Sequence, residues 1–413
     1  MKNTHIVKTI FFLVILFLMP VLSGAIEFDL ALNINGGYGN TVADENEPEL
    51  KINFVPRLFT LIGNKSELVI SAGFTYDPFS KNTFVPEILH TEFSTRFGNS
   101  SLRLGRFNYS DPLAFIADGL FDGVQFFNVS SSGIFSVGVL FSGFIWKDNT
   151  IIEMTQGDKN NNNIQFDFDN FFDTYFTSKR LIASIGWDHP SLGEFMHLNT
   201  ALIAQFDLNG YDNYTEKYDS QYLIMKARIP VNNFTIEFGG SIENVMKKTE
   251  GESEPMELAF AAEAGFLWLF PGEFPSRLSF NGKIASGKTE GFCDAFVPVT
   301  SKYYGYVLKH KMSGLSVLTL NYSSRLNQFL GMSLNASYFV RNDLGTFNGY
   351  PLIAGSDNKG HFLGPEVSGR LIWSPVSDMQ FNLGGGAFFP VLGDASPDQE
   401  IKWRVDLTAI FAF

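Results

Sequence analysis

Apolar and polar residues alternate strictly along the end of the chain, EIKWRVDLTAIFAF at 400–413. The odd positions from Trp403 to Phe413 are apolar, and the even positions from Lys402 to Thr408 are polar. Alternation over about a dozen residues exceeds the usual length of a globular strand and suits a tilted strand that spans a membrane. The alternative is the edge strand of a soluble sandwich, so the rest of the chain has to decide.

The same alternation recurs from Glu27 onward. Near the start, for example, Phe28 and Leu30 fall on one face and Asp29 and Asn33 on the other. Because successive side chains of a strand point to opposite faces, each segment has one apolar and one polar face. The pattern predicts an all-β protein.

Short and long connections between these segments follow each other in turn. The short ones contain the Gly, Pro, Asn and Ser of tight turns, and they cover 63–66, 98–100, 130–133, 190–193, 230–233, 271–275, 326–328 and 375–378. The long ones cover 40–48, 77–86, 109–120, 148–178, 209–218, 243–255, 286–313, 342–362 and 390–399. Eight short and nine long connections imply eighteen strands, with sixteen as the alternative.

An even number of strands with short periplasmic turns and long outer loops is typical of outer-membrane barrels. We therefore predict one transmembrane, antiparallel, up-and-down β-barrel over residues 26–413, with both termini in the periplasm. Its partners would include the lipid of the cell outer membrane.

Composition agrees with a barrel. The 413 residues include 44 Phe and 14 Tyr, whereas only 18% are charged, and soluble proteins carry nearer a quarter charged residues. No apolar run near ~20 residues follows residue 25, which disfavours a helical membrane protein. The single Cys293 excludes an intrachain disulfide, and the net charge of −13 argues against nucleic-acid binding.

Residues 1–25 have the features of a secretory signal peptide. Lys2 and Lys8 precede an apolar run at 10–19, and small residues lead to a cleavage site after Ala25. The run is too short for a membrane-spanning helix, and no cysteine follows it that could carry a lipid anchor.

The closing segment resembles the last strand of Gram-negative outer-membrane barrels, which also ends on a phenylalanine. In those proteins the assembly machinery reads this strand as a signal, so the resemblance implies the same role for the strand ending at Phe413. Paired with the first strand, it would bring Lys402, Arg404 and Asp406 beside Asp29 and Asn33.

Three further stretches resemble the alginate-export family of outer-membrane porins. They are SLRLGRFNYSDPLAFIADGLFDGVQFF at 101–127, GLSVLTLNYSSRL at 314–326 and GPEVSGRLIWSPVSDMQFNLGGGAFFP at 364–390. The resemblance implies an eighteen-stranded barrel; some members export an anionic polysaccharide through a basic lumen and others are general porins. This chain departs from the exporters at Phe107, where a Gln is usual, and its inward face is mixed in charge.

A water-filled channel is the expected function. The first predicted strand starts beside the cleavage site, which leaves no room for an N-terminal plug, and a barrel of ~16–18 strands is wide enough for an aqueous pore. We predict a porin for passive diffusion of small hydrophilic solutes, with anionic sugars or organic acids as candidates. Two alternatives stay open: a carrier of hydrophobic solutes of the fatty-acid type, and a structural or adhesive surface barrel.

No enzyme is expected. The histidines are scattered, and no catalytic residues, metal-ligand spacing or phosphate-binding Gly loop stands out, so we predict no cofactor.

Charged residues on the polar faces are predicted to line the pore. They are Arg57, Arg96, Arg103, Arg180, Lys226, Arg228, Arg277, Lys283, Arg370, Arg404, Glu92, Glu366 and Asp406. One interpretation is a wall of cross-strand ion pairs that holds the barrel round. The other is a basic constriction that favours anions; Arg96 and Arg103, flanking one short turn and expected to face each other, would form it with Arg57.

The longest connection, 148–178, carries two further signals. Its segment DKNNNNIQFDFD places oxygen ligands at alternating positions, which makes Asp158, Asn160, Asn162 and Asp169 a candidate calcium site, although the central Gly is missing. Its six aromatic residues between 166 and 176 predict that it folds into the barrel mouth or packs on another loop.

Overall fold

The computed structural model of the protein describes residues 26–41, 48–80, 83–209, 216–249, 252–253, 257–289, 293–344, 360–396 and 398–413. The predicted signal peptide at 1–25 lies outside these residues. Among the described helices, none has the length and apolar character needed to cross a membrane.

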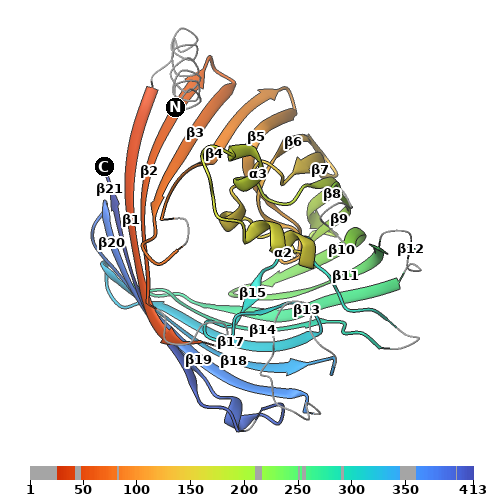
Figure 1. The fold of residues 1–413 in the computed structure, drawn as a ribbon, viewed down its shortest axis with the longest axis vertical. Helices are drawn as coiled ribbons and strands as arrows, with labels where there is room; N and C mark the ends of the chain where they lie inside the picture. The colour runs from red at the N-terminus through yellow and green to blue at the C-terminus, as the bar shows by residue number, and fades with distance from the viewer. Residues whose placement is uncertain are drawn as a thin grey trace.

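Eighteen antiparallel strands form one closed barrel, so the predicted fold and strand count are confirmed (Figure 1). In order around the barrel they are β1 (Ile26–Asn40), β2 (Glu49–Ile62), β3 (Ser66–Tyr76), β4 (Phe84–Phe97), β5 (Ser100–Ser110), β6 (Asp118–Ser130), β7 (Gly133–Phe141), β8 (Arg180–Leu192), β9 (Met196–Asp207), β10 (Glu216–Val231), β11 (Phe234–Thr249), β13 (Glu257–Phe270), β14 (Ser276–Ala285), β17 (Leu315–Arg325), β18 (Leu330–Arg341), β19 (Phe362–Val376), β20 (Met379–Phe388) and β21 (Lys402–Ala412). The predicted short connections join consecutive strands at one end of the barrel, and the long ones fall at the opposite end. The predicted connection 243–255 is the exception in its bounds, because β11 continues to Thr249.

The loops carry the remaining elements. Loop 4, residues 142–179, contains η2 (Lys147–Asn149), α2 (Gln156–Asn162) and α3 (Phe171–Thr174), and loop 7, residues 286–314, contains β15 (Tyr303–Tyr304) and β16 (His310–Lys311). Two short pieces complete the described structure: β12 (Glu252–Ser253), which pairs antiparallel with the end of β11, and η3 (Pro390–Leu392).

Strand alternation gives the barrel an apolar outer face. Outward side chains such as Phe28, Leu202 and Leu407 are more than half exposed, although they are large and apolar. In water such a surface would be unfavourable, whereas in a bilayer it contacts acyl chains. The outer face therefore belongs in a membrane.

The strand β21 closes the barrel against β1, but at a different register from the one expected. Asp406 is the ladder partner of Gly37 and Arg404 that of Gly39, so the polar end of β21 lies beside neither Asp29 nor Asn33. Closing a barrel requires the strands to be staggered, and this stagger moves the ladder towards the loop end. At the other end, the backbone of Phe413 exchanges two hydrogen bonds with Leu30.

One hairpin leaves the regular wall. The β4–β5 ladder ends at Thr91 and Arg106, although β4 continues to Phe84 along β3. The β6–β7 ladder ends at Asp122 opposite Phe141. Beyond these points β5 and β6 are paired only with each other.

Two opposed glycines form the bend at the base of this hairpin. Gly105 pairs with Gly123, and Gly105 has a φ of +114°, a conformation that other residues rarely adopt. Beside them, Arg106 donates from Nε to Asp122 Oδ1 over 2.9 Å and from Nη1 to the carbonyl of Ile88 over 2.6 Å. The "GRF…FDGV" pattern in the sequence therefore marks a hinge where two strands turn inward.

Loop 4 bridges the space that the hairpin leaves between β7 and β4. The carbonyl of Phe144 accepts a hydrogen bond from Arg106 Nη2, and the hydroxyl of Tyr175 donates to the carbonyl of Pro86 on β4. Trp146 and Tyr175 pack with Val85 in a small buried cluster. Aromatic side chains thus complete the wall where the backbone ladder is missing.

Candidate functional site

Three loops fold into the barrel and share one buried core. The core contains Phe115 and Ile116 from loop 3 (residues 111–117), Ile152 from loop 4 and Phe296 from loop 7, together with inward side chains of β8–β20. In Figure 1 loop 4, with α2 and α3, lies inside the ring of strands. The lumen is therefore narrowed by loops rather than left as an open tube.

Loop 3 crosses the lumen. The buried carboxylate of Asp111 accepts hydrogen bonds from the backbone N–H groups of Leu113, Ala114, Ile116 and Ala117, which fixes the shape of the loop. At its tip, Leu113 lies so close to Gly239 on β11 that a Cβ there would come within 2.5 Å of it. The loop therefore extends inward from β5 and β6 and contacts the wall at β11.

Loop 7 is fastened to two walls and to the other loops. Glu366 on β19 accepts from the backbone N–H groups of Tyr306, Val307 and Leu308, and the Tyr306 hydroxyl donates to Asp406 on β21. The backbone of Thr300 donates to the carbonyl of Ile116 in loop 3 over 2.9 Å. Loop 7 thus links the walls around β19–β21 to the centre of the lumen.

Loop 4 is held by a buried ion cluster. Arg180 at the start of β8 has no exposed side-chain surface, and its Nη2 donates to Asp158 Oδ2 over 2.5 Å. Its Nη1 lies 2.7 Å from Asp207 Oδ1, close enough for an ion pair but outside hydrogen-bond geometry. Further along, Lys311 of loop 7 donates to Glu153 of loop 4 over 2.7 Å.

Three residues predicted to line the pore hold loops instead. Arg180, Glu366 and Asp406 lie on inward faces, as the alternation required, but Arg180 and Glu366 are almost fully buried against loops 4 and 7. Asp406 is engaged by Tyr306 and lies 3.7 Å from Arg404. Strand parity gives the direction of a side chain, whereas its role depends on which loop folds onto it.

The calcium prediction is wrong. Asp158, Asn160 and Asn162 lie in α2, where alternate residues point to nearly opposite sides and cannot surround one ion. Asp158 caps this helix with Thr155, pairs with Arg180 and accepts from Asn209. Asp169 lies outside the helix and is exposed. The regular spacing of oxygen-bearing residues reflects a polar helix.

Most of the other predicted wall residues are paired. Lys226 and Lys283 both contact Glu263, and Glu237 joins Lys226 to Arg228. Lys283 also lies over the ring of Phe115, 4.6 Å from its centre. This part of the lumen is a wall of cross-strand ion pairs that also touches loop 3.

The remaining pairs lie elsewhere in the lumen. Arg103 donates to Gln125 and lies over the ring of Phe107, and Arg404 makes a two-point contact with Glu49. Glu92 lies 3.0 Å from His90. None of the charged residues Arg103, Arg404, Glu49 and Glu92 is fully buried.

Four predicted cations have no charged or hydrogen-bonding side-chain partner among the described residues: Arg57, Arg96, Arg277 and Arg370. Arg96 and Arg277 lie next to short turns, whereas Arg57 and Arg370 lie near the middle of their strands, on the short-turn side. All four are exposed. Arg96 does not face Arg103, since the ladder pairs Arg96 with Ser101 and Arg103 with Ser94. The predicted cluster of Arg57, Arg96 and Arg103 is therefore not formed as a unit.

Several residues of the narrowed lumen were missed by sequence reasoning. Asp111, Glu153, Tyr306 and Lys311 all lie in long connections, and inward packing was predicted for the connection 148–178 alone. A signal was present in the apolar runs LAFIA at 113–117 and FVPV at 296–299. Such runs are unfavourable in an exposed loop and indicate packing.

Buried His310 in loop 7 predicts a pH response. Burial, assisted by the charge of Lys311, lowers the pKa of His310 to about 4. A loosened loop would bind more protons between pH 6.5 and 4, so the attachment of loop 7 is stable above pH 6.5 and weakens as the pH falls towards 4, by up to ~3 kcal/mol. Single-channel recordings should show growing current noise over this window, and His310→Asn should flatten the dependence. A pH dependence that is the same in both proteins would contradict this assignment.

Comparisons with known proteins support the architecture. No protein-family model and no curated protein matches the sequence. Among solved structures, the chain is similar to three proteins of Pseudomonas aeruginosa. OccK2 (OpdF) in complex with glucuronate matches at 11% identity, with 94% of this chain and 98% of that chain covered and a TM-score of 0.59. OpdK with vanillate matches at 10% identity, with the same coverage and TM-score. OprD matches at 11% identity, over 94% of this chain and 95% of that chain, with a TM-score of 0.56.

At these identities the likeness concerns the fold. It agrees with the eighteen strands implied by the resemblance to the alginate-export family but does not extend to that family. The closed barrel and its apolar outer face place the protein in the cell outer membrane.

Proposed function

We propose that the protein is an outer-membrane channel for passive diffusion of small hydrophilic solutes, with carboxylated sugars and organic acids favoured. Its lumen is narrowed by loops 3, 4 and 7, so that passing solutes meet side chains rather than bulk water. The observation that carries the proposal is the set of partnerless arginines on the short-turn side. Among the described residues, the exposed carboxylates on this side are Glu27 and Asp29 on β1 and Glu194, Glu273 and Asp378 in the turns. On the strands themselves, the four arginines are therefore accompanied by two exposed carboxylates, and one of these, Asp29, is the ladder partner of Arg57.

Electrostatics supports the preference. Charges of one sign in a channel with low-dielectric walls raise the local concentration of the opposite ion. The structures of OccK2 and OpdK named above hold glucuronate and vanillate, and both molecules carry a carboxylate. The proposal extends this chemistry to the present chain, along with export directed by residues 1–25.

Replacing Arg57 and Arg370 together by glutamine should lower glucuronate flux about tenfold at low salt, the lower end of the range for electrostatic steering. Glucose flux should change little, because it carries no charge. Liposome swelling compares the two sugars, and the reversal potential in a salt gradient should shift towards cations. Lys65→Gln, which removes one positive charge in the turn between β2 and β3, is the control for loss of charge away from these two arginines. An equal loss of glucuronate and glucose flux in the double variant, or no liposome swelling with the wild-type protein, would refute the proposal.

One observation favours the hydrophobic-solute alternative. At the hinge of β5 and β6 the wall is completed by aromatic side chains, and Phe144 and Phe172 there are 57% and 80% exposed. A lateral route would have to pass Arg106 and Tyr175, which are buried. Uptake of a long-chain fatty acid by liposomes that contain the protein, without swelling by sugars, would establish this second candidate.

A further inference from the structure

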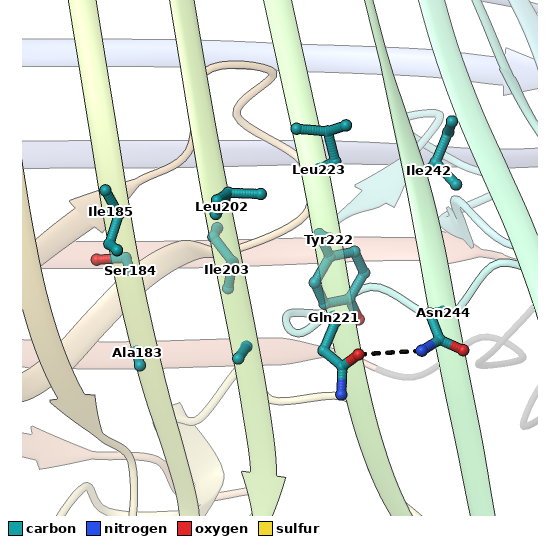
Figure 2. A pocket seen from close by; sticks show the side chains of 11 residues that line it. Ala183, Ser184, Ile185, Leu202, Ile203, Gln221, Tyr222, Leu223, Ile242 and Asn244 are labelled. Carbon is teal, nitrogen blue, oxygen red and sulfur yellow. Dashed lines mark hydrogen bonds between the residues drawn. The ribbon is translucent and has the colours of Figure 1, made fainter. Parts of the chain in front are cut away.

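A groove of about 430 Å³ lies on the barrel wall at β8–β11 (Figure 2). Ile185, Leu202, Leu223 and Ile242 are successive ladder partners across these strands and form one side of it. All four side chains are about half exposed and lie on the outer face. The groove therefore opens towards lipid and not towards the lumen.

The other side of the groove combines small and polar residues. Ala183, Ala204, Gln221 and Asn244 form the next row of ladder partners on the same face. The two alanines leave the space, and Asn244 Nδ2 donates to Gln221 Oε1 over 3.0 Å. Figure 2 shows this amide pair below the row of apolar side chains.

The amide pair has unused hydrogen-bonding capacity. Gln221 Nε2 and Asn244 Oδ1 have no partner among the described residues, so the pair presents one donor and one acceptor side by side. Rotating both side-chain amides by 180° exchanges their oxygen and nitrogen atoms, and the pair still presents one free donor and one free acceptor. On a lipid-facing surface such groups are unfavourable unless something pairs with them.

The height of the Gln221–Asn244 pair on the barrel indicates which part of a lipid it would contact. Gln221 lies ten positions before the end of β10 at Val231. At ~3.3 Å per residue and a tilt of ~40°, this is about 25 Å above the short turn, which is the height of the apolar band of such barrels. The amide pair thus lies where acyl chains join their headgroups at the loop end.

We propose that this groove binds an N-acylated glycolipid of the outer leaflet. One acyl chain lies along Leu202 and Leu223 over the two alanines, and its amide linkage pairs with Gln221 and Asn244. An amide offers both a donor and an acceptor, whereas the ester of a glycerophospholipid offers acceptors only. The groove therefore selects by linkage as well as by shape, independently of what the channel transports.

Delipidated protein in mild detergent, mixed with lipid A or with phosphatidylethanolamine, tests the proposal by native mass spectrometry. Wild-type protein should retain lipid A preferentially. The double variant Gln221→Leu, Asn244→Leu should bind lipid A about tenfold more weakly, as expected for the loss of one or two ordinary hydrogen bonds, and lose the preference. Ala204→Phe should block both lipids.

The control is Ala336→Phe, an outward alanine on β18 away from the groove, which should bind as wild type does. Heat-dependent gel mobility shows that each variant is folded, and conductance should be unchanged in all of them. Equal retention of both lipids by wild type, or lipid A binding that survives Ala204→Phe, would overturn the proposal. So would self-association of the delipidated protein that Ala204→Phe abolishes while lipid A does not bind, since the groove would then be an interface between copies.

Discussion

Replacement of Arg180 by methionine should release loop 4 and raise the single-channel conductance. The arginine is fully buried between Asp158 and Asp207, so its removal leaves two carboxylates in a site without solvent. Breaking a buried ion pair in this way costs roughly 3–5 kcal/mol. We expect the attachment of α2 to β8 and β9 to be lost, while the eighteen-stranded wall stays intact. Planar-bilayer recording and limited proteolysis of loop 4 measure the two effects.

A compensating variant tests whether the uncompensated carboxylates cause the effect. Combining Arg180→Met with Asp158→Asn and Asp207→Asn removes the uncompensated charges, and the conductance should return most of the way to the wild-type value. Arg228→Met is the matched comparison, because Arg228 is half exposed in its contact with Glu237 and such pairs contribute at most ~1 kcal/mol. A channel of unchanged conductance and protease resistance in Arg180→Met would show that loop 4 is held by other contacts.

Substitution of Gly105 by alanine should strongly destabilise the barrel. Its φ of +114° is unfavourable for alanine by about 1–2 kcal/mol. In addition, the new Cβ would overlap the carbonyl oxygen of Thr91 at the last pair of the β4–β5 ladder. Backbone cannot move aside as a flexible side chain can, so the total loss should approach ~4 kcal/mol, the upper range for single substitutions. The urea midpoint of the folded band in heat-modifiability gels measures it.

Gly98→Ala separates the two causes. Gly98 has a φ of +60° in the turn between β4 and β5, and a Cβ there would meet nothing within 4 Å. The free energy of unfolding of this variant should fall by only about 1 kcal/mol, the cost of placing alanine in this backbone conformation. If both variants lost the same stability, the close approach to Thr91 would have no energetic weight and the hinge would be less tightly packed than described.

The strands and turns of the barrel wall were predictable because each depends on residues that are neighbours in the sequence. Alternation gives the face of each side chain, and Gly, Pro and Asn give the turns, so eighteen strands follow from connections alone. The inward direction of Lys226, Lys283 and Arg370 follows in the same way. Even the packing of loop 4 was indicated, because six aromatic residues in one loop are difficult to solvate.

The contents of the lumen were not predictable because they depend on contacts between distant segments. Asp158 has the local surroundings of a metal ligand, and only the fold brings Arg180 to it. Glu366 has the same parity as Arg370, but loop 7 covers one and leaves the other exposed. The register of β21 against β1 likewise depends on the stagger of the whole barrel and not on either strand.

The use of loop 4 to complete the wall restricts how this barrel can diversify. In a barrel with an intact ladder, a loop can be lengthened, shortened or replaced while the scaffold stays the same. Here Trp146 and Tyr175 of loop 4 are buried against β4, where the backbone ladder is missing, so a change to this part of the loop also opens the wall. Under the proposed function, new substrate ranges would be reached more readily through the arginines of the opposite end, which can be altered one at a time.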